Sequence, residues 1–192
     1  VAPIITRLGS ATVTVECGTD YIDAGATAND GCDGDLTDDI VTANPVNVYA
    51  TGVYTVTYTV MDSTGNAAAQ RSRTVNVVDN APPVITLLGD ATLTTECGDM
   101  YHDAGAVAHD ICDGDLSANI ITAGVVDANT PGMYTITYRV DDASGNSAAQ
   151  VARNVNVIDA VPPDLTLLGD PVVVVECGGD YIDAGATAFD VC

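Results

Sequence analysis

The sequence predicts an all-β protein made of tandem β-sandwich repeats, each about 80 residues long. Long stretches return at an offset of about 80 residues: PIITRLGSATVTVECG (3–18) returns as PVITLLGDATLTTECG (83–98). Apolar and polar residues alternate with a period of two, and no helical periodicity of useful length is present. Short apolar runs are separated by frequent turn signals, which is typical of a sandwich.

The first copy is expected to begin with short strands. IITRL (4–8) and ATVTVE (11–16) are two of them, separated by a glycine break, and GATAND (25–30) is a third. The clearest strand is GVYTVTYTV (52–60), where tyrosines and valines alternate with threonines and should face the core. The core tyrosines are expected to bond backbone through their hydroxyls; they are Tyr54, Tyr58, Tyr134 and Tyr138.

Turns and linkers follow these strands. STGN (63–66) and ASGN (143–146) predict tight hairpin turns, with RTVNVVD (73–79) and RNVNVID (153–159) as the next strands. Paired prolines in DNAPP (79–83) and DAVPP (159–163) indicate stiff linkers. We therefore expect one repeat at residues 1–80, a second at 81–160 and the truncated start of a third at 161–192.

The charge balance is strongly acidic. The 27 Asp and Glu residues face 5 basic residues, all of them Arg, and the formal net charge is −22. Such a surface repels phosphate, so we expect no nucleic-acid partner, and no apolar run is long enough for membrane insertion. The chain should attract cations instead. No nucleophile with a base and no GxSxG motif is visible, so we expect no enzyme.

Acidic residues recur at the same positions in each copy. The loop after the third strand, the hairpin turn and the incoming linker should meet at one pole of a sandwich. Loops and acidic linkers of this kind supply the six to eight oxygens that Ca²⁺ prefers. We expect Ca²⁺ at these junctions, with the candidate ligands Asp30, Asp33, Asp35, Asp62, Asn66, Asp79, Asn80, Asp110, Asp113, Asp115, Asp142, Asn146, Asp159 and Asp190.

Other interpretations of the acidic residues remain open. Asp and Asn also stabilise turns by bonding their own backbone, so the acids could be turn caps on a solvated surface. Glu16 and Asp23 could equally be structural hydrogen-bond acceptors. His102 and His109 occur in one copy only, which argues against a catalytic or metal role.

An even count of two cysteines in each copy predicts disulfides. No CxxC motif occurs, which argues against zinc or redox sites. Local pairs would make each module self-sufficient, and we favour them: Cys17–Cys32, Cys97–Cys112 and Cys177–Cys192. Inter-repeat pairs are the alternative, since an extended intervening segment would hold a local pair too far apart to bond. These are Cys17–Cys112 and Cys97–Cys192.

Several motifs occur in a recognisable order. PxITLxG, YxDAGAxAxD, CDGDL, GxYTxTYxVxDxxGN and RxVxVxD together resemble the bacterial immunoglobulin-like repeats of surface proteins, including the Cry22-like type and the related hyalin-repeat modules. The resemblance covers essentially the whole chain and implies tandem immunoglobulin-like β-sandwich domains. It also implies an extracellular or cell-surface location and a role as spacer or adhesive stalk.

The function expected from these features is structural. The chain would be a stalk, fibre or adhesin shaft, stiffened by calcium and disulfides, with neighbouring identical repeats as its partners. One alternative is a carbohydrate- or protein-binding accessory module, for which Tyr49 or other tyrosines could contact sugar. Another is the subunit of a self-assembling, homo-oligomeric extracellular filament.

Overall fold

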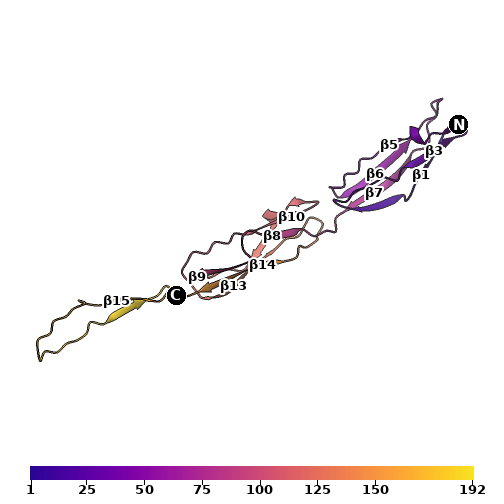
Figure 1. Ribbon diagram of the computed structural model, residues 1–192. Helices are drawn as coiled ribbons and strands as arrows, with labels where there is room; N and C mark the ends of the chain where they lie inside the picture. Colours follow the sequence, from indigo (N-terminus) through magenta and orange to yellow (C-terminus); the bar gives the residue numbers. More distant parts are fainter. The chain divides into compact units, whose positions relative to one another are not determined.

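The structure is a computed structural model that describes residues 1–192. It confirms the predicted all-β class, since the only helices are two single 3₁₀ turns, η1 (Thr37–Asp39) and η2 (Ser117–Asn119). Figure 1 shows the strands along the chain. No helix has the length and apolar character that crossing a membrane requires.

The first copy forms two sheets. The order of the first sheet is β1-β3-β4, with β1 (Ile4–Arg7), β3 (Ala26–Asp30) and β4 (Gly34–Asp35). The order of the second is β2-β7-β6-β5, with β2 (Thr12–Glu16), β7 (Arg71–Val78), β6 (Gly52–Thr59) and β5 (Val41–Ala43). The two strands on either side of the glycine break therefore belong to different sheets.

The second copy repeats this order as β11-β10-β8 and β12-β13-β14-β9. Its strands are β8 (Val84–Leu87), β9 (Thr92–Glu96), β10 (Ala106–Asp110), β11 (Gly114–Asp115), β12 (Ile121–Ala123), β13 (Gly132–Arg139) and β14 (Val151–Ile158). In residues 161–192, β15 (Asp164–Leu167) pairs antiparallel with β16 (Ala186–Phe189).

The chain folds as two compact units. The first consists of Val1–Val84, Ala108–Ala118 and Asp141–Ala148, and the second of Ile85–Val107, Asn119–Val140 and Ala149–Cys192. The first unit thus contains the whole first sequence copy and two loops of the second copy. The boundaries 1–80, 81–160 and 161–192 stay a prediction about the repeats.

Strands with alternating buried and exposed residues form the core of the first unit. Val56 and Tyr58 of β6 and Val75 of β7 are fully buried and pack with Ile5 of β1 and Ala28 of β3. The threonines between the core residues of β6 lie on its more exposed face. This is the arrangement that the period of two predicts.

The predicted turns and strand ends differ in detail from the structure. The turn at 63–66 lies inside a longer connection, in which Met61 bridges Ala67 and β7 begins at Arg71. The Tyr54 hydroxyl donates to the Ala50 carbonyl at 2.9 Å, as expected. The Tyr58 hydroxyl instead donates to the Asp23 carboxylate at 2.7 Å, so the prediction of a backbone acceptor was wrong there.

Each sandwich contains a buried arginine that bonds several segments of the chain. Arg73 is 2% exposed; its guanidinium pairs with Asp23 and also donates to the carbonyls of Ser10 and Leu8. Burial alone would raise the pKa of Asp23, but hydrogen bonds from the tyrosine hydroxyls and the charge of Arg73 lower it. Burial and the adjacent carboxylate raise the pKa of Tyr58 to about 12.

The second copy has the same network. Arg153 is 1% exposed, pairs with Asp103 and stacks 5.8 Å from the centre of the Tyr138 ring. The Tyr138 hydroxyl donates to Asp103 at 2.6 Å. Asp23 and its counterpart are therefore structural acceptors for buried arginines, which was one of the two roles expected for Asp23.

Candidate functional site

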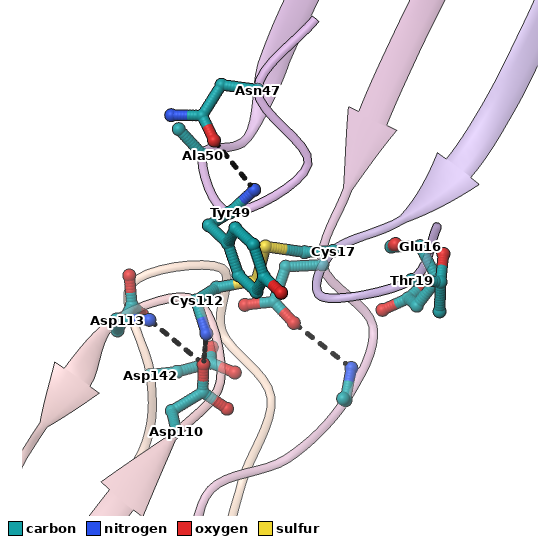
Figure 2. Close-up of a disulfide and its surroundings, with 12 residues drawn as sticks. Glu16, Cys17, Thr19, Asn47, Tyr49, Ala50, Asp110, Cys112, Asp113 and Asp142 are labelled. Atoms are coloured by element: carbon teal, nitrogen blue, oxygen red, sulfur yellow. Dashed lines mark hydrogen bonds between the residues drawn. A yellow bond between two sulfur atoms is a disulfide. The ribbon is translucent and has the colours of Figure 1, made fainter. Parts of the chain in front are cut away.

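The disulfides join cysteines of neighbouring sequence copies. Cys17 is bonded to Cys112, with 6.0 Å between the Cα atoms, and Cys97 is bonded to Cys192, with 6.1 Å. Figure 2 shows the first bond, with Asp110, Asp113 and Asp142 on the Cys112 side of it. Cys32 and Cys177 are free and exposed. The local pairs Cys17–Cys32, Cys97–Cys112 and Cys177–Cys192 were therefore the wrong register.

Strand geometry explains why the local pair cannot form. Cys17 follows β2 and donates its amide to Val78 at the end of β7, which pairs with the start of β6. Cys32 lies in the loop that meets Ser63, just beyond the other end of β6. Eight residues of β6, at about 3.3 Å each, separate these two points by about 26 Å. A disulfide requires Cα atoms within about 7 Å.

The linker after β7 is held against the end of β2. Glu16 accepts hydrogen bonds from the Asn80 amide at 2.6 Å and from the Asn80 side chain at 2.8 Å. These bonds lower the pKa of the Glu16 carboxyl. In the second copy Glu96 accepts from the Ala160 amide at 2.6 Å. Glu16 is thus a structural acceptor, and its bonds fix the position of the residue beside Asp79.

The linker residue Asp79 lies among three acids from two loops. Asp110 ends β10 and accepts from the amides of Cys112 at 2.7 Å and Asp113 at 3.0 Å. Asp113 accepts from the Ala143 amide at 2.7 Å, which ties the two loops together. Carboxylate oxygens of Asp79, Asp113 and Asp142 lie within 4.8 Å of one another, and Asp79 is equally close to Asp110.

Asn146 completes the arrangement on the other side of the linker. Its side-chain amide donates to Asp142 at 2.8 Å and to the carbonyl of Asp79 at 3.2 Å. A single side chain therefore joins the turn after β13 to the linker. All of these residues belong to the first compact unit. We call Asp79, Asp110, Asp113 and Asp142 the junction cluster.

The junction cluster has no basic counter-charge. The two ion pairs of the structure are Arg73–Asp23 and Arg153–Asp103, both outside it. Asp79 is 8% exposed and its Oδ2 atom is buried without a hydrogen-bond partner. Burial, followed by the nearby carboxylates of Asp110 and Asp142, raises the pKa of Asp79. A cation at this position would satisfy the unpaired oxygen and offset the repulsion.

The first copy has a related group of acids. Carboxylate oxygens of Asp30, Asp33 and Asp62 lie within 4.8 Å of one another. Asp62 accepts three hydrogen bonds at its Oδ1, two from Thr64 and one from the Asn66 amide, and one from the Asn66 side chain at its Oδ2. The Asn66 bond is the main reason that the pKa of Asp62 falls to about 2.

The remaining predicted ligands lie outside these groups. Asp35 and Asp115 accept from the amides of Thr37 and Ser117, two residues further on, and so bond their own turns, as in the turn-cap interpretation. Asn66 and Asn80 donate their side-chain amides to carboxylates. Asp159 and Asp190 line a cavity of about 300 Å³ in the second unit. No histidine takes part in an acidic group.

Glu16 and Gly18 position the junction. The structural-acceptor role left open for Glu16 is the observed one, although its partner, the linker, was not predicted. The contact of Gly18 with Ile111 was missed: Gly18 has φ +76°, and a Cβ there would collide with the Ile111 side chain. The recurrence of Glu-Cys-Gly in every copy was the available signal for both.

Comparison with known families gives a match to both complete copies. The family model described as "Bacterial surface protein, Ig-like domain" matches residues 5–77 and 85–157. Together with the two sheets of each copy, this match bears out the predicted immunoglobulin-like sandwich and the resemblance to surface-protein repeats.

Individual relatives share part of their length with the chain. Hyalin from Lytechinus variegatus is 31% identical over 71% of this chain and 27% of its own length. Pesticidal crystal protein Cry22Aa from Bacillus thuringiensis is 34% identical over 63% of this chain and 17% of its own length. A lipoprotein from Bacteroides thetaiotaomicron is 21% identical over 56% of this chain and 51% of that chain, with a TM-score of 0.38.

Proposed function

Because the chain belongs to the bacterial surface protein Ig-like domain family, we propose that it is a structural segment of an extracellular shaft, stalk or adhesin. Two cross-copy disulfides support this role, since such bonds persist in oxidising, extracellular surroundings. In this role the chain acts as a mechanical connector and carries out no catalysis.

We propose that the junction cluster binds Ca²⁺. The observation that carries this proposal is the buried, unpartnered Oδ2 of Asp79 among carboxylates of two other loops. Hard oxygen ligands from several loops, with flexible spacing, suit Ca²⁺ better than Mg²⁺, which demands an octahedral set. The ion would attach the linker to the loops at 110–113 and 142–146 and so restrict its movement.

Disulfide and ion would act on the same joint. The Cys17–Cys112 bond holds the end of β2 to the loop that carries Asp110 and Asp113. The Asp79 ligand reaches the same loop from the linker. A joint with two independent attachments resists bending in more than one direction, which is what a shaft under load requires.

The carbohydrate- or protein-binding role receives less support. A sugar-binding face would need a row of exposed aromatic rings, whereas the exposed large aromatics are Tyr49, Tyr181 and Phe189, on separate segments. The exposed face of β6 carries threonines. The structural role therefore accounts for more of the arrangement than a binding face does.

Calcium titration of the whole chain by isothermal calorimetry tests the metal proposal. Asp79→Asn is expected to weaken one class of site by about tenfold or more, since it removes the charge and one ligand oxygen. Asp38→Asn is the matched control, because Asp38 is exposed and lies outside the acidic groups. No calcium uptake by the wild type, or equal uptake by both variants, would refute the proposal.

A further inference from the structure

The acidic loop of the first copy has the same internal bonds as its counterpart in the junction. Cys32 donates its amide to Asp30 at 2.8 Å, as Cys112 does to Asp110 at 2.7 Å. The Ser63 amide donates to Asp33 at 2.8 Å, as the Ala143 amide does to Asp113 at 2.7 Å. The two loops are thus built to the same plan.

What differs is the partner of each loop. The second-copy loop is bonded to Cys17, and Asn146 donates to the linker carbonyl of Asp79. In the first copy, Cys32 is a free, exposed thiol, and Asn66 donates to the neighbouring Thr64 hydroxyl instead. In the second copy, Cys112 and Asn146 hold a Glu-Cys-Gly segment and a linker. Their first-copy counterparts, Cys32 and Asn66, are exposed.

The carboxylate of Asp30 is an independent observation that points to a ligand at the first-copy loop. Asp30 is 5% exposed, and its Oδ2 is buried without a hydrogen-bond partner. Its carboxylate oxygens also lie within 4.8 Å of those of Asp33 and Asp62. In the junction, the corresponding Asp110 has the linker residue Asp79 beside it. A buried unpartnered carboxylate oxygen is costly, and a partner that brings a cation would relieve the cost.

We propose that the surface formed by Asp30, Cys32, Asp33, Asp62 and Asn66 docks the Glu-Cys-Gly segment of another repeat of this type and bonds it through Cys32. In the isolated chain, that segment is Glu176-Cys177-Gly178 of a second copy. The same motif supplies Cys17 and Cys97, and both bond the cysteine of a CDGD-type loop or its counterpart. Cys177 is exposed and free.

The inference rests on the proposed shaft function and deepens it, because it links the first-copy loop covalently to a further repeat. Forming the bond removes one proton from each thiol and two electrons in total. Glutathione disulfide accepts them and becomes two glutathione thiols, so the exchange balances. Both thiols are on the surface and accessible to this oxidant.

Two single-thiol variants of the whole chain test the proposal. Cys177→Ser leaves Cys32 as the one free thiol, and Cys32→Ser leaves Cys177. The first is labelled with ¹⁵N, the two are mixed in equal amounts with calcium and a glutathione redox buffer, and the dimers are weighed by intact mass spectrometry. We expect the Cys32–Cys177 heterodimer to exceed the two homodimers together by about fivefold. A statistical 1:2:1 mixture, or no dimer, would overturn the proposal.

A charge control separates docking from simple repulsion. Asp62→Asn in the Cys177→Ser background is expected to lower the heterodimer excess, because it disturbs the turn that holds Asn66. Asp38→Asn removes the same charge elsewhere and should leave the excess unchanged. If repulsion alone governed the reaction, both variants would form more dimer, and the proposal would be wrong.

A parallel mixture in excess chelator distinguishes this inference from the calcium proposal. Heterodimer excess that persists in chelator supports docking without a role for the ion. Excess that appears only with calcium supports both proposals together. Calcium uptake in calorimetry with a statistical dimer mixture leaves the metal proposal standing and refutes the docking inference alone.

Discussion

Removing the Cys17–Cys112 bond should destabilise the first compact unit by several kcal/mol. The bond closes a loop of 95 residues, and the Cys97–Cys192 bond offers no shorter path between the two ends. A cross-link restricts the unfolded chain in proportion to the logarithm of loop length. For 95 residues this contributes about 4.7 kcal/mol at 25 °C.

The perturbation is the double variant Cys17→Ser/Cys112→Ser, which leaves no unpaired thiol from the broken bond. Urea unfolding under non-reducing conditions, followed by circular dichroism, gives the free energy of unfolding. Cys32→Ser is the matched control, because this thiol is free and exposed. The double variant is expected to lose about 4–5 kcal/mol, and the control less than about 0.5 kcal/mol.

The local register makes the opposite prediction for the control. If Cys17 were bonded to Cys32, the closed loop of about 15 residues would contribute about 3 kcal/mol, and Cys32→Ser would remove it. A loss of that size in the control, or a loss below about 1 kcal/mol in the double variant, would refute the cross-copy reasoning.

Three further predictions concern the joint and the core. Cys17→Ser/Cys112→Ser should weaken calcium binding at the junction cluster by about threefold to tenfold, because the bond pre-positions Asp110 and Asp113. Calorimetry measures the affinity with Cys32→Ser as the control, since that thiol is free, and equal weakening in both variants would contradict this. Asp23→Asn should cost about 3–5 kcal/mol in urea unfolding, because it leaves the buried Arg73 unpaired, whereas Arg139→Gln on the surface should be nearly neutral. Asp62, whose pKa is lowered to about 2, adds stability above its unfolded pKa of about 3.9 that is lost as the pH falls toward 2; urea midpoints should show this loss in the wild type and not in Asp62→Asn.

Local pattern was enough to predict much of the fold. Alternation in residues 52–60 predicted β6 and its buried face, and the repeated motifs predicted two sandwiches of one kind. The short strands β4 and β5 were not predicted, because two or three residues show no periodicity. Their pairing with longer strands, and not their own sequence, makes them strands.

The candidate site was predictable where residues recur and less so where pairing is distant. Recurrence at one pole predicted that Asp79 and Asn80 would meet Asp110, Asp113, Asp115, Asp142 and Asn146. The structure brings Asp79, Asp110, Asp113 and Asp142 together and bonds Asn146 to the Asp79 carbonyl, whereas Asn80 bonds Glu16 and Asp115 accepts from Ser117. The disulfide register depended on where β2 and β3 end relative to β6, which spacing along the chain does not reveal. The Arg73–Asp23 pair was missed because its partners are 50 residues apart.

We propose above that Asp79 and its neighbours hold calcium. Because the folded state raises the pKa of Asp79, its charged form costs stability at neutral pH when no ion is bound. Asp79→Asn should therefore be more stable than the wild type in chelator. In calcium the wild type should gain stability as it binds the ion, and the variant should gain much less.

Thermal unfolding of both proteins, with millimolar calcium and with excess chelator, is the direct test of calcium binding at Asp79. We expect a crossover, with the variant melting higher in chelator and the wild type melting higher in calcium. Melting temperatures that keep the same order in both buffers, with no response of the wild type to calcium, would contradict it.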